Sequence, residues 1–82
     1  MNKSMYLLEV CEKNLYGNEY IFKRRISDNI GSIEDWIKAN AQKWVLLPVS
    51  VDCDGYGNGS IYLSYDHNCV LCTFRTTNIA TI

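Results

Sequence analysis

The chain has 82 residues, which allows one domain, residues 1–82, with a modest core and excludes a dinucleotide-binding fold or a barrel enzyme. A composition of 48% hydrophobic and 21% charged residues is typical of a globular protein and argues against intrinsic disorder. The net charge of −1, with eight Lys and Arg against nine Asp and Glu, argues against nucleic acid as a direct partner, because phosphate binding usually needs a basic excess.

Two segments near the start of the chain predict a β-hairpin. Residues 5–12 and 19–26 each alternate between two sets of side chains, as half-buried strands do. Between them, residues 14–18 include the Gly and Asn that accept positive φ angles in a tight connection. These segments are therefore expected to pair in antiparallel fashion.

The register of this hairpin follows from where the turn is centred. With the centre near residue 16, Val10 is expected opposite Phe22 and Glu9 opposite Lys23, which pairs apolar with apolar and opposite charges with each other. Arg24 is then the one misfit, because it falls on the apolar face.

The next segment predicts a helix of about three turns. Ser32 is expected to cap it, with Asp35 completing a capping box and Glu34 adding negative charge to the first turn. Lys43 gives the helix end the favourable positive charge. The apolar stripe expected to face the core consists of Ile33, Trp36, Ile37 and Ala41.

Three further alternating runs, at residues 45–51, 61–65 and 69–75, predict three strands. Residues 52–59, which are rich in glycine, and residues 66–68 are the expected connections. The order is therefore ββαβββ, and the fold class α+β. The simplest packing is an antiparallel sheet of about five strands with one helix on one face.

One helix covers only one face of such a sheet, so the other face needs an explanation. Its predicted apolar content exceeds what a monomer usually exposes, and such patches mark interfaces. In the alternative, residues 76–82 fold back over this face, or errors in the predicted strand register inflate its apolar content. The side chains assigned to it are Leu7, Cys11, Ile21, Leu46, Tyr62, Cys69 and Leu71, among Glu9, Lys23, Arg25 and Arg75.

A protein partner, or a second copy of the chain, is the expected cover for this face. The six tyrosines also favour a contact surface, because tyrosine offers a large area at low entropic cost. One of them stands in the glycine-rich loop, where it could serve recognition. The predicted partner-binding residues are Leu46, Tyr62, Leu71, Ile21, Lys23, Arg25 and Tyr56.

The four cysteines make a zinc site one candidate. Cys69 and Cys72 form a CxxC motif, His67 precedes it, and Cys11 and Cys53 could supply further thiolates. The motif lies in a predicted strand, however, where positions three apart point to opposite faces, with their Cα atoms about 10 Å apart. We therefore expect free thiols, buried or half-buried, and no bound metal; a small zinc-binding module is kept as an alternative function.

The glycine-rich loop partly matches a calcium-binding loop. Asp52 and Asp54 stand at the first and third positions, but Tyr56 replaces the third acidic ligand and Leu63 the bidentate Glu. Turn geometry alone explains its glycines.

No catalytic motif is found. His67 is the only histidine and is expected to be a solvated turn residue beside Asp66. Since no nucleophile elbow, phosphate-binding loop or pair of carboxylates accompanies it, the chain is predicted not to be an enzyme and to need no cofactor.

A membrane location is not expected. No apolar run approaches the roughly 18–20 residues that cross a bilayer, the longest being residues 44–49. Glu9 interrupts the first apolar stretch too early for a signal peptide. The expected location is the cytoplasm.

The hairpin, the segment Ile26–Ile37 and the following strands together resemble many small phage-encoded proteins, among them anti-CRISPR proteins, which bind and block host defence complexes. The resemblance covers size, segment order and the helix start Ser32-x-Glu34-x-Trp36. It implies a stoichiometric binder in the host cytoplasm. The predicted function is non-enzymatic inhibition of a larger intracellular complex, such as a CRISPR-Cas nuclease; the alternative is an immunity protein or antitoxin that neutralises a cognate toxin.

Overall fold

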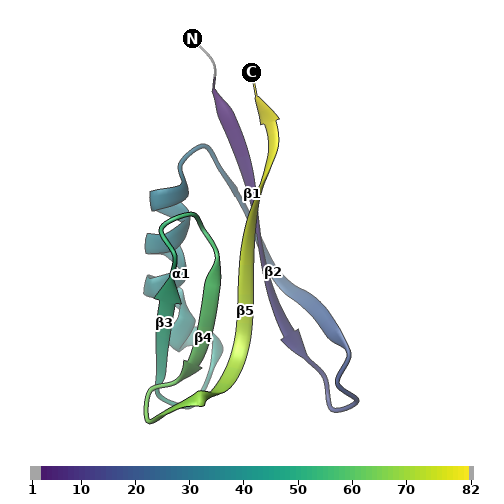
Figure 1. The fold of residues 1–82 in the computed structure, drawn as a ribbon, viewed down its shortest axis with the longest axis vertical. Helices are drawn as coiled ribbons and strands as arrows, with labels where there is room; N and C mark the ends of the chain where they lie inside the picture. Colours follow the sequence, from purple (N-terminus) through teal and green to yellow (C-terminus); the bar gives the residue numbers. More distant parts are fainter. Residues whose placement is uncertain (1–2, 82) are drawn as a thin grey trace.

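The computed structural model describes residues 3–81, which form one antiparallel sheet with a helix on one face (Figure 1). The elements are β1 (Ser4–Lys13), β2 (Glu19–Ser27), α1 (Ile30–Trp44), β3 (Val49–Cys53), β4 (Gly59–Leu63) and β5 (Asp66–Thr81). The five strands lie in the order β2-β1-β5-β4-β3. The predicted α+β class and the order ββαβββ are therefore confirmed.

Strand β5 is the longest element and joins the two halves of the sheet. Its first half pairs with β4, where Cys72 faces Ile61, and its second half pairs with β1, where Thr81 faces Ser4. Residues 76–81 therefore extend the sheet and do not fold back over its uncovered face. The alternative that residues 76–82 cover that face is wrong for this range, and Ile82 lies outside the described residues.

A β-bulge in β2 changes the register of the first hairpin. Near the turn, Cys11 faces Ile21, but Phe22 is an extra residue with no partner on β1. After Phe22, each β2 residue pairs one position away from the predicted register. Its side chain therefore points to the opposite face of the sheet from the one predicted. The pairs are Val10 with Lys23 and Glu9 with Arg24, so the predicted pairs Val10 with Phe22 and Glu9 with Lys23 are wrong.

A second irregularity lies between β4 and β5. Ile61 faces Cys72 while Tyr62 faces Val70, so Leu71 is the extra residue. Val70 consequently shares the face of Tyr62 and is 52% exposed, whereas Leu71 packs against the core. The assignment of Leu71 to the uncovered face is therefore wrong, and Val70, expected on the helix side, lies on the uncovered face instead.

The connection between β4 and β5 is also displaced. Ser64 and Tyr65 form the turn, and Asp66 already pairs with Leu63 as the first residue of β5. The predicted connection at residues 66–68 is therefore wrong, because the strand begins inside it.

Helix α1 begins earlier than its sequence pattern predicts. Asn29 is the N-cap: it has an extended backbone, and its side-chain Oδ1 accepts a hydrogen bond of 3.0 Å from the Ser32 N–H. Ser32 is therefore not the cap, and the first turn holds neither Glu34 nor Asp35. Lys43 does lie in the last turn, as predicted.

The segment at residues 45–48 is a connection and not the start of a strand. The Gln42 side chain holds it: Nε2 donates to the carbonyls of Val45 (3.2 Å) and Leu47 (2.9 Å), and Oε1 accepts from the Val49 N–H (3.1 Å). Since these backbone groups are satisfied by a side chain, they need no strand partner. The predicted strand at 45–51 therefore begins only at Val49.

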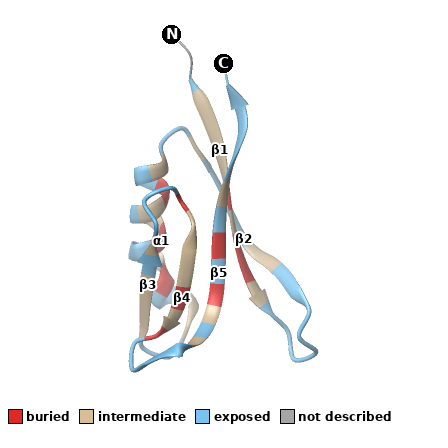
Figure 2. Ribbon diagram, in the orientation of Figure 1, coloured by how far each residue is buried: buried red, intermediate tan, exposed pale blue. Residues whose placement is uncertain are grey.

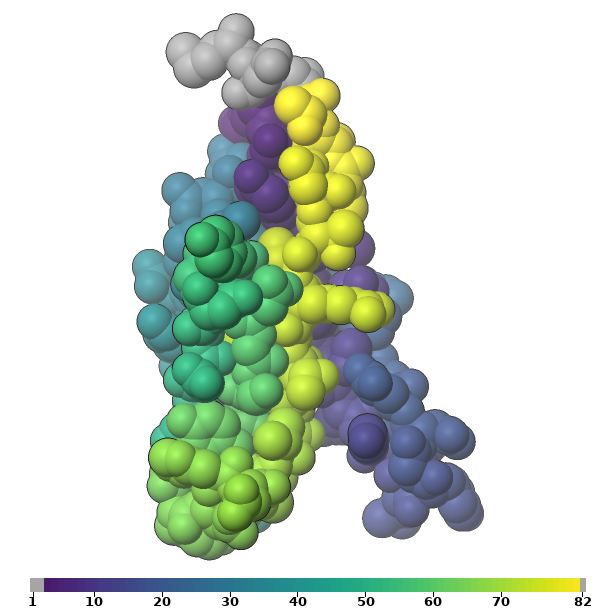
Figure 3. Space-filling view, viewed as in Figure 1, coloured from purple at the N-terminus to yellow at the C-terminus, as the bar shows by residue number. Residues whose placement is uncertain are grey.

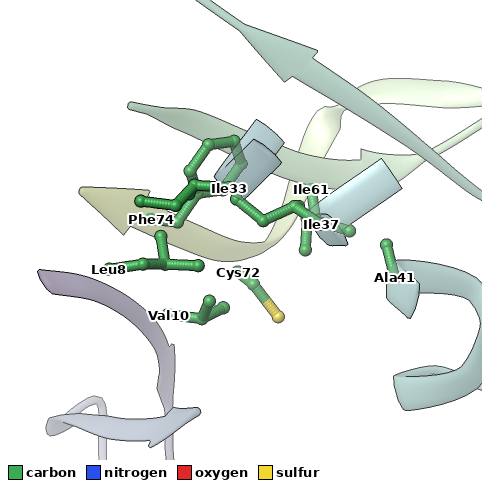
Figure 4. Close-up of a cluster of buried hydrophobic side chains, with 8 residues drawn as sticks. All are labelled: Leu8, Val10, Ile33, Ile37, Ala41, Ile61, Cys72 and Phe74. Atoms are coloured by element: carbon green, nitrogen blue, oxygen red, sulfur yellow. The ribbon is translucent and has the colours of Figure 1, made fainter. Parts of the chain in front are cut away.

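The core lies between α1 and the sheet (Figure 4). Of the predicted helix stripe, Ile33, Ile37 and Ala41 are buried, whereas Trp36 is half-buried, with its ring 5.2 Å from that of Trp44. Figure 2 shows in red where the buried positions lie along the helix and the strands. The buried cluster consists of Leu8, Val10, Ile33, Ile37, Ala41, Ile61, Cys72 and Phe74.

Candidate protein-binding face

The sheet face opposite α1 has no covering layer among the described residues. Because side chains alternate along a strand and Leu8 and Val10 point into the core, their neighbours on β1 point to the other side. We call this side the open face. Its central members are Arg24 and Ile26 of β2, Leu7 and Glu9 of β1, and Arg75 and Thr77 of β5.

A row of three charged side chains crosses the open face. The Glu9 carboxylate lies between two guanidinium groups, with its Oε2 3.8 Å from Arg24 Nε and its Oε1 3.8 Å from Arg75 Nε. The Glu9 side chain is 16% exposed, against 65% and 68% for the two arginines. Such exposed pairs stabilise a fold little. One carboxylate also leaves most N–H donors of two guanidinium groups available to a partner carboxylate.

Apolar side chains flank this charged row on both sides. Toward one end of the strands, Ile26 is 59% exposed and lies opposite the half-buried Leu7. Toward the other end, Val70 is 52% exposed and lies opposite the half-buried Tyr62. Arginine beside apolar and aromatic groups is the composition that protein interfaces favour.

Two of the predicted contact residues lie on the open face as expected. Ile21 is half-buried opposite Cys11, and Tyr62 lies on β4 with its ring edge to face against His67, the ring centroids being 4.6 Å apart. His67 is exposed, but it belongs to β5, so its assignment to a turn is wrong.

Two other predicted contact residues, Lys23 and Arg25, lie on the helix side. The Arg25 guanidinium carbon is 5.0 Å from the Trp36 ring centroid, a cation–π contact with α1, and Lys23 faces the core residue Val10. The bulge in β2 is the cause, since it reverses the faces of the residues that follow it. Arg24 takes their place on the open face, and its misfit in the predicted register was the one sign of this.

Leu46 and Leu71 are not on the open face. Leu46 is fully exposed in the connection between α1 and β3, outside the sheet. Leu71 is half-buried against the core because it is the extra residue of the bulge in β5. The structure therefore does not bring these two together with Tyr62 and Ile21.

The glycine-rich loop presents Tyr56, which is 72% exposed, but its backbone faces a side chain of α1. Oε2 of Glu34 accepts hydrogen bonds from the N–H groups of Gly55 and Gly57, both at 3.0 Å. Both glycines have φ of 87°, which other residues rarely adopt. The loop thus directs amide donors toward a carboxylate, the reverse of a calcium loop, which directs oxygens toward a cation.

Thr76 of β5 fixes the other side of this loop. Its Oγ1 donates to the Gly57 carbonyl at 2.7 Å, and its N–H donates to Asn58 Oδ1 at 3.1 Å. A Cβ at position 57 would overlap the Thr76 side chain. The loop is therefore attached to both the helix and the sheet.

All four cysteines are free thiols, two buried and two half-buried, as predicted. Burial, followed by the nearby Glu12 and Cys11, raises the pKa of the Cys72 thiol to about 11, so this sulfur stays protonated at neutral pH. Among residues 3–81, no three His, Cys, Asp or Glu side chains gather into a metal-binding group.

Comparison with protein-family models, with curated proteins and with solved structures finds no match for this chain. The resemblance to anti-CRISPR proteins therefore stays a prediction from size and segment order. Within the described part of the chain, no helix has the length and apolar character that crossing a bilayer requires.

Proposed function

We propose that this chain is a non-enzymatic protein-binding module that acts by occupying a surface of a larger partner through its open face. The observation that carries the proposal is the row Arg24–Glu9–Arg75, two exposed guanidinium groups around one carboxylate, with the exposed apolar side chains of Ile26 and Val70 on either side. A complementary partner surface would carry a carboxylate within an apolar patch.

Protein fits this face better than nucleic acid does. Two arginines that share one carboxylate give a local charge of only about +1, whereas nucleic-acid affinity comes from several phosphate contacts. The net charge of −1 for the whole chain points the same way.

The target class that we propose is a host-defence nuclease complex, CRISPR-Cas machinery included, which the chain would inhibit stoichiometrically in the host cytoplasm. This part rests on the resemblance in size and segment order to small phage-encoded inhibitors. A cognate toxin, with the chain as its immunity protein, is the alternative target. Gene neighbourhood distinguishes the two, since a toxin gene beside this one would favour the alternative.

The binding proposal is tested by affinity capture from host lysate with matched variants. Arg75→Glu reverses a charge on the open face, and Lys38→Glu makes the same change on the exposed side of α1. We expect wild type and Lys38→Glu to enrich the same protein, and folded Arg75→Glu to lose it. Equal enrichment by all three would contradict the assignment of the face.

The target class is tested in cells. A host with an active CRISPR-Cas system is challenged by a targeted phage while it expresses wild type or Arg75→Glu. We expect plaques to form with wild type and not with Arg75→Glu. Protection from a neighbouring toxin, without any effect on plaque formation, would support the alternative target.

A further inference from the structure

The sheet splits at one end, and the split forms a cleft. The ladder between β1 and β5 ends at the pair Cys11 and Thr73, although β1 continues to Lys13 and β5 begins at Asp66. Beyond that pair the β1–β2 hairpin swings away from β5, leaving a visible notch at the lower end of the molecule (Figure 3). The cleft has a volume of about 480 Å³, within the range of roughly 300–1,000 Å³ that ligand sites occupy.

The two walls of the cleft differ in chemistry. The β5 wall consists of Val70, Leu71, Cys72 and Thr73, and it is mainly apolar. The stretch Val70–Cys72 pairs with β4 on one side only, so its backbone on the cleft side has no ladder partner. Such an unpaired strand edge is a template for an added strand.

The hairpin wall carries a net negative charge. It is formed by Glu12, Lys13 and Glu19, and Lys13 lies directly opposite Glu19, so two carboxylates stand against one ammonium group. The ion pairs within residues 3–81 include neither of the two carboxylates. Glu12 accepts a hydrogen bond from the neutral Tyr20 hydroxyl.

The two buried thiols at the cleft respond to this negative charge. Burial raises the pKa of Cys11, and Glu19 raises it further. Burial likewise raises the pKa of Cys72, with Glu12 as the next cause. Burial is the first cause of both shifts, the carboxylates act in the same direction, and Arg75 lowers the pKa at Cys11.

We propose that this cleft binds an extended segment of a protein partner that carries a Lys or Arg side chain next to an apolar one. The segment adds as a strand to the free edge of β5 at Val70–Cys72, its apolar side chain contacts Val70, and its cation pairs with Glu12 and Glu19. This deepens the proposed function and rests on it, because it assigns a second contact to the same partner-binding module.

The test uses the whole chain and a displayed library of random linear peptides of about ten residues, the length of one strand. We expect enriched peptides to place Lys or Arg among β-branched residues. The affinity for these peptides should fall about tenfold or more in the double variant Glu12→Gln, Glu19→Gln. Val70→Asp should reduce the affinity to a similar extent. Amide resonances of Val70–Cys72 should shift on titration with an enriched peptide.

Lys38→Glu, on the exposed side of α1, is the control and should leave peptide binding unchanged. Enrichment of acidic peptides, the absence of any enrichment, or equal binding by the cleft variants would overturn the proposal. A dimer that the Glu12→Gln, Glu19→Gln variant abolishes would assign the cleft to a second copy and would also overturn it. If Arg75→Glu loses the captured partner while the double variant Glu12→Gln, Glu19→Gln keeps it, the proposed function stands and this inference fails.

Discussion

The two faces of the sheet differ in the burial and the charge of the side chains that they present. Toward α1, the strands present buried apolar side chains and one thiol, packed against a single helix stripe. Toward the other side, the same strands present a carboxylate between two exposed arginines, with isoleucine and valine half in solvent. Simple alternation along β1 therefore separates the residues that stabilise the fold from the residues that are available to a partner.

The largest expected effect on stability comes from comparing one isoleucine on the helix side of the sheet with one on the open face. Ile37 is fully buried, so Ile37→Ala should lower the free energy of unfolding by about 2–5 kcal/mol, from lost burial and the cavity that remains. Ile26 is 59% exposed, and Ile26→Ala should cost less than about 1 kcal/mol. Urea denaturation measures both. Similar costs for the two would break the distinction between the faces.

A pair of glycines tests how closely the loop approaches the covered side of the sheet. Gly55 and Gly57 share a φ of 87°, but only at Gly57 would a Cβ meet Thr76. We expect Gly55→Ala to cost about 1 kcal/mol from backbone strain alone, and Gly57→Ala about 2–3 kcal/mol, by thermal or urea unfolding. Equal costs would show that Thr76 moves aside freely.

The start of the helix gives a smaller, paired effect. Asn29→Ala removes the capping oxygen and should cost about 1 kcal/mol, whereas Ser32→Ala should cost nearly nothing, because only the Ser32 N–H takes part in the cap. Circular dichroism during urea unfolding measures the difference. If Ser32→Ala proved the more destabilising, Ser32 would be the N-cap, as the sequence pattern predicts, and Asn29 would not.

The smallest expected effect is a change in stability at acidic pH that comes from the Asp54 carboxyl group. Hydrogen bonds from the Tyr56 N–H and the Asn58 side chain hold the pKa of Asp54 below its usual 3.8. Since the folded pKa is the lower one, the carboxylate stabilises the fold above the unfolded pKa, and this stability is lost as the pH falls through the folded pKa. A carboxyl NMR titration should show Asp54 ionising below 3.8, and Asn58→Ala should raise its pKa. An unchanged value in the variant would remove Asn58 as a cause.

The sequence predicts the parts of this fold that depend on periodicity. The helix stripe of Ile33, Ile37 and Ala41 and the two sets of alternating strands follow from spacing alone. The start of strand β3 does not, because it depends on Gln42, whose side chain bonds backbone groups in the connection before that strand. A polar residue on a helix surface gives no sign of such a role.

The sequence predicts that one sheet face is uncovered, but it identifies only some of the residues that lie on that face. Ile21 and Tyr62 lie where alternation places them. Arg24 replaces Lys23 and Arg25 because one extra residue in β2 reverses every later side chain. Where an extra residue falls depends on which pairs fit best across the whole sheet, and a single strand does not contain that information. The misfit of Arg24 was the available signal.

Strand β5 also sets the order in which this sheet can assemble. Its neighbour β1 lies at the other end of the chain, so the central ladder joins residues as distant as Ser4 and Thr81. During synthesis the first hairpin and the helix can form early, but the centre of the sheet must wait for β5, which follows the other four strands in the sequence. Non-local pairing of this kind slows folding, and until it occurs β1 and β4 each expose an unpaired edge to other chains.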